Sequence, residues 1–385
     1  MIPEPQRTYV LELLAALGSA ADDFVVAGAQ AMKFAVDGAR GTKDVDFILD
    51  VVALRAEPFA LAETLQRLGY TPVEEARNFQ FEKNIPNSRE KMRIEFMAPE
   101  EYKRRADFRV DVQDGVHARA CAGGSIALAQ SDSHDLAGAL PNGEKFTGRL
   151  RVTRPHALVL LKLLALSDRY SNIRGPREAR HDREEAQTHA ADIVAIISAQ
   201  PDPAQFAAQF LSQFQADPLL GVRVLGILAD SFRETTSPGL IVYAEYLAAN
   251  TPTGHDTQAD LRQETERARR ILSPILPPSE FFAIAAAIDD SSDWEKVPQL
   301  VEDYLSGLEN ARIAISDDLA LGFLPAAAFG GAYKPGDTFI ANASVAIQKL
   351  SKEQRDLLRA YLISRAEQLI ANPQLLLRFP HALQN

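Results

Sequence analysis

The amino-acid sequence predicts an α+β fold, in which a small mixed sheet flanked by helices is followed by a mainly helical region. In the first 200 residues, short apolar runs typical of strands, such as 24–27 and 44–49, are interspersed with helical patterns. After residue 200 the helical patterns dominate. Two prolines within residues 200–203 interrupt regular structure between these parts. We therefore expect one domain over 1–200 and a mainly helical accessory domain over 201–385.

The first part contains the elements of the expected sheet and its flanking helices. The predicted strands lie at 24–27, 44–49, 91–97, 109–113 and 116–120, the last two forming a hairpin around Asp114 and Gly115. The predicted helices lie at 10–17, 30–36, 54–68, 155–166 and 188–198. Strands and helices mixed in this order are typical of an α/β or α+β domain with a small sheet.

The second part carries helical patterns separated by breaks rich in proline, glycine and serine. The predicted helices lie at 205–214, 219–232, 259–272 and 297–308, and a strand is predicted at 339–347. Ser351 and Gln354 form a capping box that begins the last helix, which ends before Pro373.

Composition excludes several classes of protein. The 385 residues carry 41 basic and 52 acidic side chains, a net charge of −11, which excludes a generally basic nucleic-acid coat but allows a local basic patch. Cys121 is the single cysteine, so a disulfide framework and a multi-cysteine metal site are excluded. Residues 1–17 lack the long apolar core of a signal peptide, and no apolar run is long enough to span a bilayer. We expect a cytoplasmic protein with no membrane partner.

The most informative pattern joins a glycine turn to a pair of carboxylates. Gly28 follows the first predicted strand and opens a helix, where backbone N–H groups can approach a phosphate. Asp44 and Asp46 lie on one face of the second predicted strand, because side chains alternate along a strand. Carboxylates about 7 Å apart on one face can share Mg²⁺, which gathers substrate phosphates. An acidic pair that binds nothing is the alternative interpretation of these two residues alone.

A third carboxylate fits the same arrangement. In the predicted strand 91–97, Met92, Ile94 and Phe96 alternate with Arg93 and Glu95, so Glu95 points away from the apolar face. Three acidic groups around metal ions are typical of phosphoryl or nucleotidyl transfer. The alternative is a solvated strand face in which the Arg93 and Glu95 side chains pair.

Two helices in the first part each carry a charge where only apolar residues are expected. Lys162 lies in a helix that is apolar nearly all round. We therefore expect its ammonium group to face a polar cleft in which an anion such as a triphosphate binds. Asp192 lies in a second apolar helix and requires a cationic partner, for which Lys162 and Arg169 are the candidates. A purely structural ion pair and a snorkelling lysine remain alternatives.

These residues resemble the DNA polymerase β-type nucleotidyltransferase superfamily, and within it the AbiEii/AbiGii toxin-like branch associated with toxin–antitoxin and phage-defence systems. The similarity extends over about residues 20–200 and rests on a set of polar and glycine residues in a fixed order, namely Gly28, Arg40, Thr42, Asp44, Asp46, Glu95, Lys162, Arg169 and Asp192.

The resemblance implies a role for each matching residue. Asp44, Asp46 and Glu95 would hold Mg²⁺ and, with Lys162 and Asp192, form the catalytic set. The NTP would be bound by the turn and the segment after it, that is by Gly28, Ala29, Arg40, Thr42 and Lys162. Asp182 competes with Asp192 for the last catalytic position, since a charged stretch separates Lys162 from Asp192.

The function expected on these grounds is magnesium-dependent transfer of a nucleotide from an NTP to an acceptor hydroxyl. The resemblance favours tRNA or another RNA as acceptor and a cognate antitoxin as partner, while a protein hydroxyl or a small molecule is equally compatible with the residues. Arg174, Arg177, Arg180 and Arg183 recur every three residues and form either a solvated face or an RNA contact. Because Ala29 replaces the second Gly or Ser usual in that family, a binding module without turnover is the alternative function.

Overall fold

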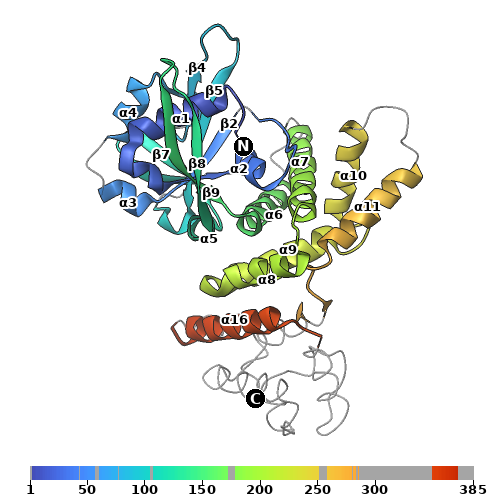
Figure 1. Cartoon of the computed structure of the whole chain (residues 1–385). Helices are drawn as coiled ribbons and strands as arrows, with labels where there is room; N and C mark the ends of the chain where they lie inside the picture. Colours follow the sequence, from blue (N-terminus) through green and yellow to red (C-terminus); the bar gives the residue numbers. More distant parts are fainter. Residues whose placement is uncertain are drawn as a thin grey trace, which may run out of the picture. The chain divides into compact units, whose positions relative to one another are not determined.

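The computed structural model packs as two compact units, Met1–Phe206 with Gly239–Ile271, and Ala207–Pro238 with Leu272–Asn385 (Figure 1). The structure describes residues 2–42, 44–56, 60–76, 78–104, 107–171, 178–250, 258–279, 281–282, 285 and 349–371. The units interleave along the chain, and the division into domains expected after residue 200 stays a prediction.

The first unit is built on a mixed sheet of nine strands, which confirms the α+β class. The strands are β1 (Phe24–Ala27), β2 (Asp44–Leu49), β3 (Thr71–Pro72), β4 (Gln80–Asn84), β5 (Lys91–Pro99), β6 (Arg109–Gln113), β7 (Val116–Cys121), β8 (Ser131–Ala139) and β9 (Lys145–Thr153). Their main order is β3-β4-β5-β2-β1-β9-β8, and the β6–β7 hairpin joins through β7 to β5. At the centre, β2 pairs antiparallel with β1 and parallel with β5.

Helices and short 3₁₀ turns make up the rest of the first unit. In chain order they are α1 (Gln6–Leu17), η1 (Gly18–Asp23), α2 (Gly28–Ala35), α3 (Val51–Ala56), α4 (Leu61–Arg67), η2 (Glu74–Ala76), η3 (Glu100–Tyr102), α5 (Gly124–Ala129), α6 (Pro155–Ser171), α7 (Ala179–Ser198), α10 (Pro238–Asn250) and α11 (Gln258–Leu272). Helix α1 packs on β8 and β9, whereas α2 and α5 pack on β2. Helix α6 contacts α2 and α5 and packs along α7.

Alternation along the central strands separates the two faces of the sheet. On one face Phe24 contacts Phe47 and Phe96, with ring centroids 5.8 and 5.9 Å apart. On the other face Ala27 and Ile48 pack with residues of β5 and α5. Because the period of a strand is two, Asp44, Asp46 and Glu95 all fall on this second face. The predicted carboxylates therefore lie on the side of the sheet that α5 and α6 approach.

In the first unit the structure corrects one predicted helix and contains several elements that were not predicted. The helix expected at 54–68 is wrong, because α3 ends at Ala56 and Ala60 has extended backbone before α4 begins. The strands β8 and β9 were not predicted, since their outer residues are polar and exposed. The short strands β3 and β4 and the helices α5 and α10 were also missed. Strand β9 matters for the site because it pairs in parallel with β1 and leads directly into α6.

The second unit is helical where it is described. It contains the end of α8 (Pro203–Ser212), η4 (Gln213–Ala216), α9 (Pro218–Phe232) and α16 (Lys352–Ala371). Helix α16 packs on α9 and η4. The capping box that begins α16 is confirmed, with Gln354 N 3.2 Å from Ser351 Oγ and Ser351 N 2.9 Å from Gln354 Oε1. The predicted helix 297–308 and strand 339–347 lie outside the described residues. No helix among the described residues is long and apolar enough to cross a membrane.

Candidate functional site

The glycine turn after β1 is pressed directly against the carboxylate of Asp46. Gly28 begins α2 with φ +61°, a value that side chains other than glycine rarely adopt. A Cβ atom on Gly28 would overlap Asp46 Oδ2 and lie 2.8 Å from Asp46 Cγ. Only glycine at this position therefore allows the first turn of α2 to lie so close to Asp46 on β2. Ala29, predicted to contact the nucleotide, is buried in that first turn.

The predicted carboxylates line up across two neighbouring strands. Asp46 of β2 is the register partner of Glu95 of β5, and Asp44 is the partner of Arg93. Adjacent strands lie about 4.8 Å apart, so Asp46 and Glu95 are neighbours on the sheet. Burial, and then the negative charge of Glu95, raise the pKa of Asp46 to about 6. We call Asp44, Asp46 and Glu95 the acidic face.

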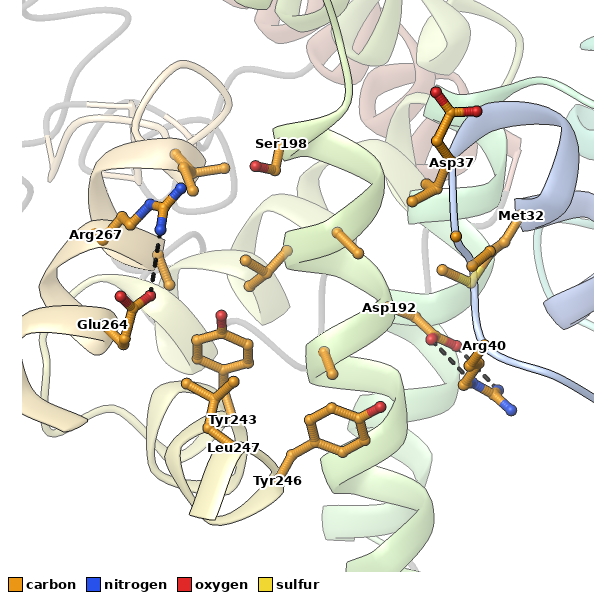
Figure 2. Close-up of a pocket in the computed structure, with 18 residues that line it drawn as sticks. Met32, Asp37, Arg40, Asp192, Ser198, Tyr243, Tyr246, Leu247, Glu264 and Arg267 are labelled. Atoms are coloured by element: carbon orange, nitrogen blue, oxygen red, sulfur yellow. Dashed lines mark hydrogen bonds and ion pairs between the residues drawn. The ribbon is translucent and has the colours of Figure 1, made fainter. Parts of the chain in front are cut away.

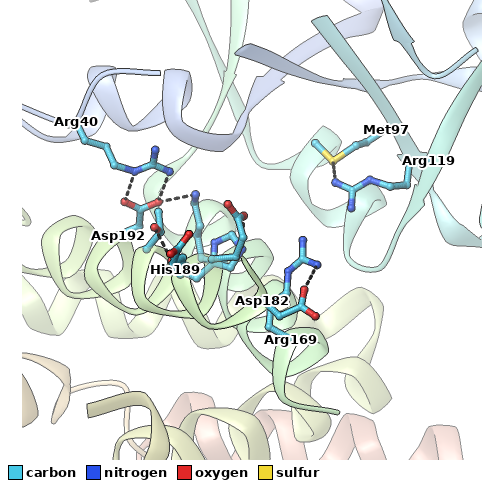
Figure 3. Close-up of polar contacts among 11 residues, drawn as sticks. Arg40, Met97, Arg119, Arg169, Asp182, His189 and Asp192 are labelled. Atoms are coloured by element: carbon cyan, nitrogen blue, oxygen red, sulfur yellow. Dashed lines mark hydrogen bonds and ion pairs between the residues drawn. The ribbon is translucent and has the colours of Figure 1, made fainter. Parts of the chain in front are cut away.

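Glu95 already has two partners that the sequence did not suggest. Its Oε1 lies 2.7 Å from Nε of Arg119 on β7, and its Oε2 accepts a hydrogen bond from Gln80 Nε2 at 2.6 Å. Arg119 also donates to Met97 Sδ at 3.6 Å (Figure 3). Alternation in the predicted strand 116–120 places Arg119 on the face opposite Val116 and Ala118, which was the available signal. Its pairing with Glu95 depends on the β5–β7 register.

The acidic face fits Mg²⁺ in the chemistry of its donors, since carboxylate oxygens are the ligands this ion takes. Burial first, and the negative charge of Glu95 second, disfavour the ionised form of Asp46, which a bound cation would stabilise. However, no three His, Cys, Asp or Glu side chains of the described residues gather closely enough to hold a metal ion. Asp44 and Asp46 are the residues that would hold it. Glu95 joins them only if it releases Arg119.

Facing the acidic face from α6 and α7 is a chain of three bonded charges, which we call the salt link. Lys162 Nζ lies 2.7 Å from Asp192 Oδ2. Arg40, from the segment before β2, donates to both oxygens of Asp192, from Nε and Nη2, at 3.1 Å each (Figure 3). Lys162 also acts on the acidic face, where its charge opposes the rise in the pKa of Asp46. Three predicted residues far apart in sequence are thus directly joined.

The single carboxylate of Asp192 is compensated by two cations, which leaves the salt link with a net positive charge. Burial alone would raise the pKa of Asp192, but Lys162 and Arg40 outweigh it and hold that pKa below its usual value. Burial likewise disfavours the charged form of Arg40, and its bond to Asp192 overcomes this, so the pKa of Arg40 is raised. Asp192 and Arg40 therefore remain ionised at neutral pH.

A second ion pair between α6 and α7 distinguishes Asp182 from Asp192, the two candidates for the last catalytic position. Asp182 Oδ1 accepts from Arg169 Nη1 at 3.1 Å, at the far end of α7 from Asp192 (Figure 3). Asp192, and not Asp182, is therefore bonded to Lys162. Of the arginine ridge, Arg180 pairs with Glu184 at 2.9 Å, and Arg183 donates from Nε to Glu245 of α10 at 2.9 Å. The other two arginines of the ridge lie outside the described residues.

Two further side chains belong to this region and were not predicted. His189 lies one turn before Asp192 on α7, and burial together with the charge of Lys162 lowers its pKa to about 3. Its Nδ1 is buried and meets no hydrogen-bond partner among the described residues. Gln30 of α2 donates to the carbonyl of Thr42 at 3.3 Å, and Thr42 Oγ1 accepts from the backbone N–H of Asp44. Thr42 thus supports the start of β2.

Comparison of the chain with family models, with curated proteins and with solved structures finds no match. The proposal below therefore rests on the geometry of the acidic face and the salt link and on the order of residues in the sequence.

Proposed function

We propose that the chain transfers a nucleotide from an NTP to an acceptor hydroxyl and belongs with the DNA polymerase β-type nucleotidyltransferases. The observation that carries this proposal is the contact between Gly28 and Asp46. It places the first turn of a helix, whose N–H groups favour phosphate, against a carboxylate strand that favours a divalent cation. A purely structural carboxylate has no need of a glycine turn at this position.

Each part of the site has a chemical task in such a transfer. The turn at Gly28 and the side chains of Lys162 and Arg40 stabilise the negative charge of the triphosphate. Asp44 and Asp46 would hold Mg²⁺, which supplies further charge compensation when bound. The acceptor oxygen forms a bond to the α-phosphorus, the bond from that phosphorus to the bridging oxygen breaks, and pyrophosphate leaves. Glu95 is our candidate for accepting the proton of the hydroxyl.

The acceptor we favour is tRNA or another RNA, in the toxin–antitoxin or phage-defence setting of the AbiEii/AbiGii-like branch. This part of the proposal rests on the sequence resemblance, including the order of Gly28, Arg40, Asp44 and Asp46. A cognate antitoxin is the partner that this setting implies.

The test is transfer of label from α-labelled NTPs to total RNA or protein in the presence of Mg²⁺. We expect Asp46→Asn to reduce transfer by at least about 100-fold, because it removes charge used in the transition state. Asp135→Asn, the same change on the exposed edge strand β8, should leave the rate unchanged. Transfer of γ-label instead of α-label would indicate a phosphotransferase, and transfer unaffected by Asp46→Asn would refute this site.

A binding module without turnover is the second candidate, and the pairing of Glu95 with Arg119 favours it. In that case Arg119 takes the place of a cation at the acidic face. NTP binding without label transfer, equal in the wild type and Asp46→Asn, would support this alternative.

A further inference from the structure

A groove runs across α7 beside the salt link. It has a volume of about 460 Å³, within the range of small-molecule sites. Its floor is formed by small side chains of α7, including Ala191, Ala195 and Ser198 (Figure 2). The segment 36–40 forms one wall, and α10 and α11 form the other. All the lining residues belong to the first unit. We call this the α7 groove.

Two aromatic rings on one wall suit a planar ligand. Tyr243 and Tyr246 lie three residues apart on α10, so they share one face of that helix. Both line the α7 groove and are half-buried. Their rings stand beside the floor of α7 (Figure 2). Aromatic side chains of this kind stack on nucleobases, whichever base is present.

The polar groups of the groove are divided between its two ends. On the α11 side, Glu264 and Arg267 form an exposed ion pair at 3.7 Å, which offers an acceptor and donors to the edge of a base. On the opposite wall, Arg40 donates to Asp192 from Nε and Nη2. The other terminal nitrogen of its guanidinium, Nη1, takes no part in these two bonds and can donate to a ligand. Both arginines that line the groove are thus paired with a carboxylate. The groove therefore suits a ligand whose ring system is largely neutral.

The salt link connects the groove to the acidic face. Arg40 lines the groove and bonds to Asp192, which bonds to Lys162, and Lys162 acts on Asp46. A ligand whose ring lies against the tyrosines would therefore place an anionic tail at Arg40, and Asp192 and Lys162 lead from there toward the acidic face. A nucleoside phosphate has this combination of a planar neutral end and an anionic end.

We propose that the α7 groove binds the base and sugar of a nucleoside phosphate, with the rings of Tyr243 and Tyr246 against the base and Arg40 at the phosphate. This inference rests on the proposed function and specifies where its nucleotide is held. The nucleotide is either the donor NTP or the terminal nucleotide of an RNA acceptor, because both present the same chemistry to the groove.

The test is binding measured by isothermal titration calorimetry on the full chain without Mg²⁺, so that no turnover is required. The probes are each of the four NTPs and a short single-stranded RNA with a free 3′ hydroxyl. We expect Tyr246→Ala to weaken binding at least about fivefold, the lower end of what one stacking aromatic contributes. Tyr246→Phe keeps the ring and should bind within about twofold of the wild type. Loss with the NTPs identifies the donor site, and loss with the RNA alone identifies the acceptor site.

A second variant keeps the test decisive if Tyr246→Ala does not fold. Ser198→Trp places a large side chain on the exposed floor of the groove and should abolish binding. Binding that is unchanged in both Tyr246→Ala and Ser198→Trp, or no binding by the wild type, would overturn the inference. The α-label assay decides the proposed function separately. Tyrosine-dependent binding without label transfer would refute that function and leave the groove assignment standing.

Discussion

The acidic face and the salt link handle buried charge in opposite ways. In the salt link, Asp192 is bonded to two cations, and its pKa lies below the usual value although burial opposes ionisation. In the acidic face, Asp46 is also buried but lies beside a second carboxylate, and burial together with the charge of Glu95 raises the pKa of Asp46 to about 6. Two buried aspartates thus have pKa values shifted in opposite directions, because Asp192 has cations as neighbours and Asp46 has another carboxylate.

This difference indicates which region is complete without a ligand. A compensated ion pair orients its members, whereas a cluster of like charges is stabilised when a cation is added. We infer that the salt link is already formed before any ligand binds, whereas the acidic face is completed by a bound cation. The predictions below test that distinction, from the largest expected effect to the smallest.

Gly28→Ala should have the largest effect, because it affects the contact on which the acidic face is built. The new Cβ would lie 2.8 Å from Asp46 Cγ and would force a positive φ on alanine. We expect the free energy of unfolding to fall by at least about 3 kcal/mol, as measured by urea denaturation. Gly143→Ala is the control, since Gly143 also has positive φ but a Cβ there meets no atom within 4 Å. A cost of about 1–2 kcal/mol is expected for it. An equal loss of unfolding free energy in Gly28→Ala and Gly143→Ala would contradict the close contact between Gly28 and Asp46.

Lys162→Met and Arg169→Met remove matched cations from the two ion pairs between α6 and α7. Each leaves an aspartate with a buried side chain that has lost a cation, so each should destabilise the chain by about 2–4 kcal/mol. Label transfer should be lost only in Lys162→Met, because Arg169 pairs with Asp182 away from the acidic face. Equal loss of transfer in both variants would show that the salt link contributes to folding and has no specific role in the transfer.

His189→Gln should give the smallest effect, visible only as a change in pH dependence. The pKa of His189 in the folded chain is about 3, below the ordinary 6.5, because of burial and the nearby Lys162. The unfolded chain therefore binds a proton that the folded chain does not, and this contribution to stability is lost as pH falls below about 6.5. Between pH 7.5 and 5.5 we expect the wild type to lose about 1 kcal/mol more than the variant.

How much of the site could be predicted is clearest from Asp192 and Glu95. Asp192 lies in an apolar helix, and a buried carboxylate requires a partner, so Lys162 could be suggested from local sequence. Arg119 could not be paired with Glu95 in the same way, because the two side chains meet only through the parallel pairing of β5 with β7, in which Arg119 is the register partner of Met97. Tyr243 and Tyr246 were missed because α10 was not predicted and because its packing brings it back to the first unit.

The sequence alone determined the local features of this protein. Alternation in 44–49 and 91–97 sets the face on which Asp44, Asp46 and Glu95 lie, and periodicity of two is a property of any extended strand. The tertiary structure decided which of these groups meet. The turn at Gly28 lies on Asp46, Arg40 reaches Asp192 across 152 residues of sequence, and α10 closes the α7 groove. Such contacts depend on strand register and helix packing, which involve segments far apart in the chain and leave no periodic pattern in it.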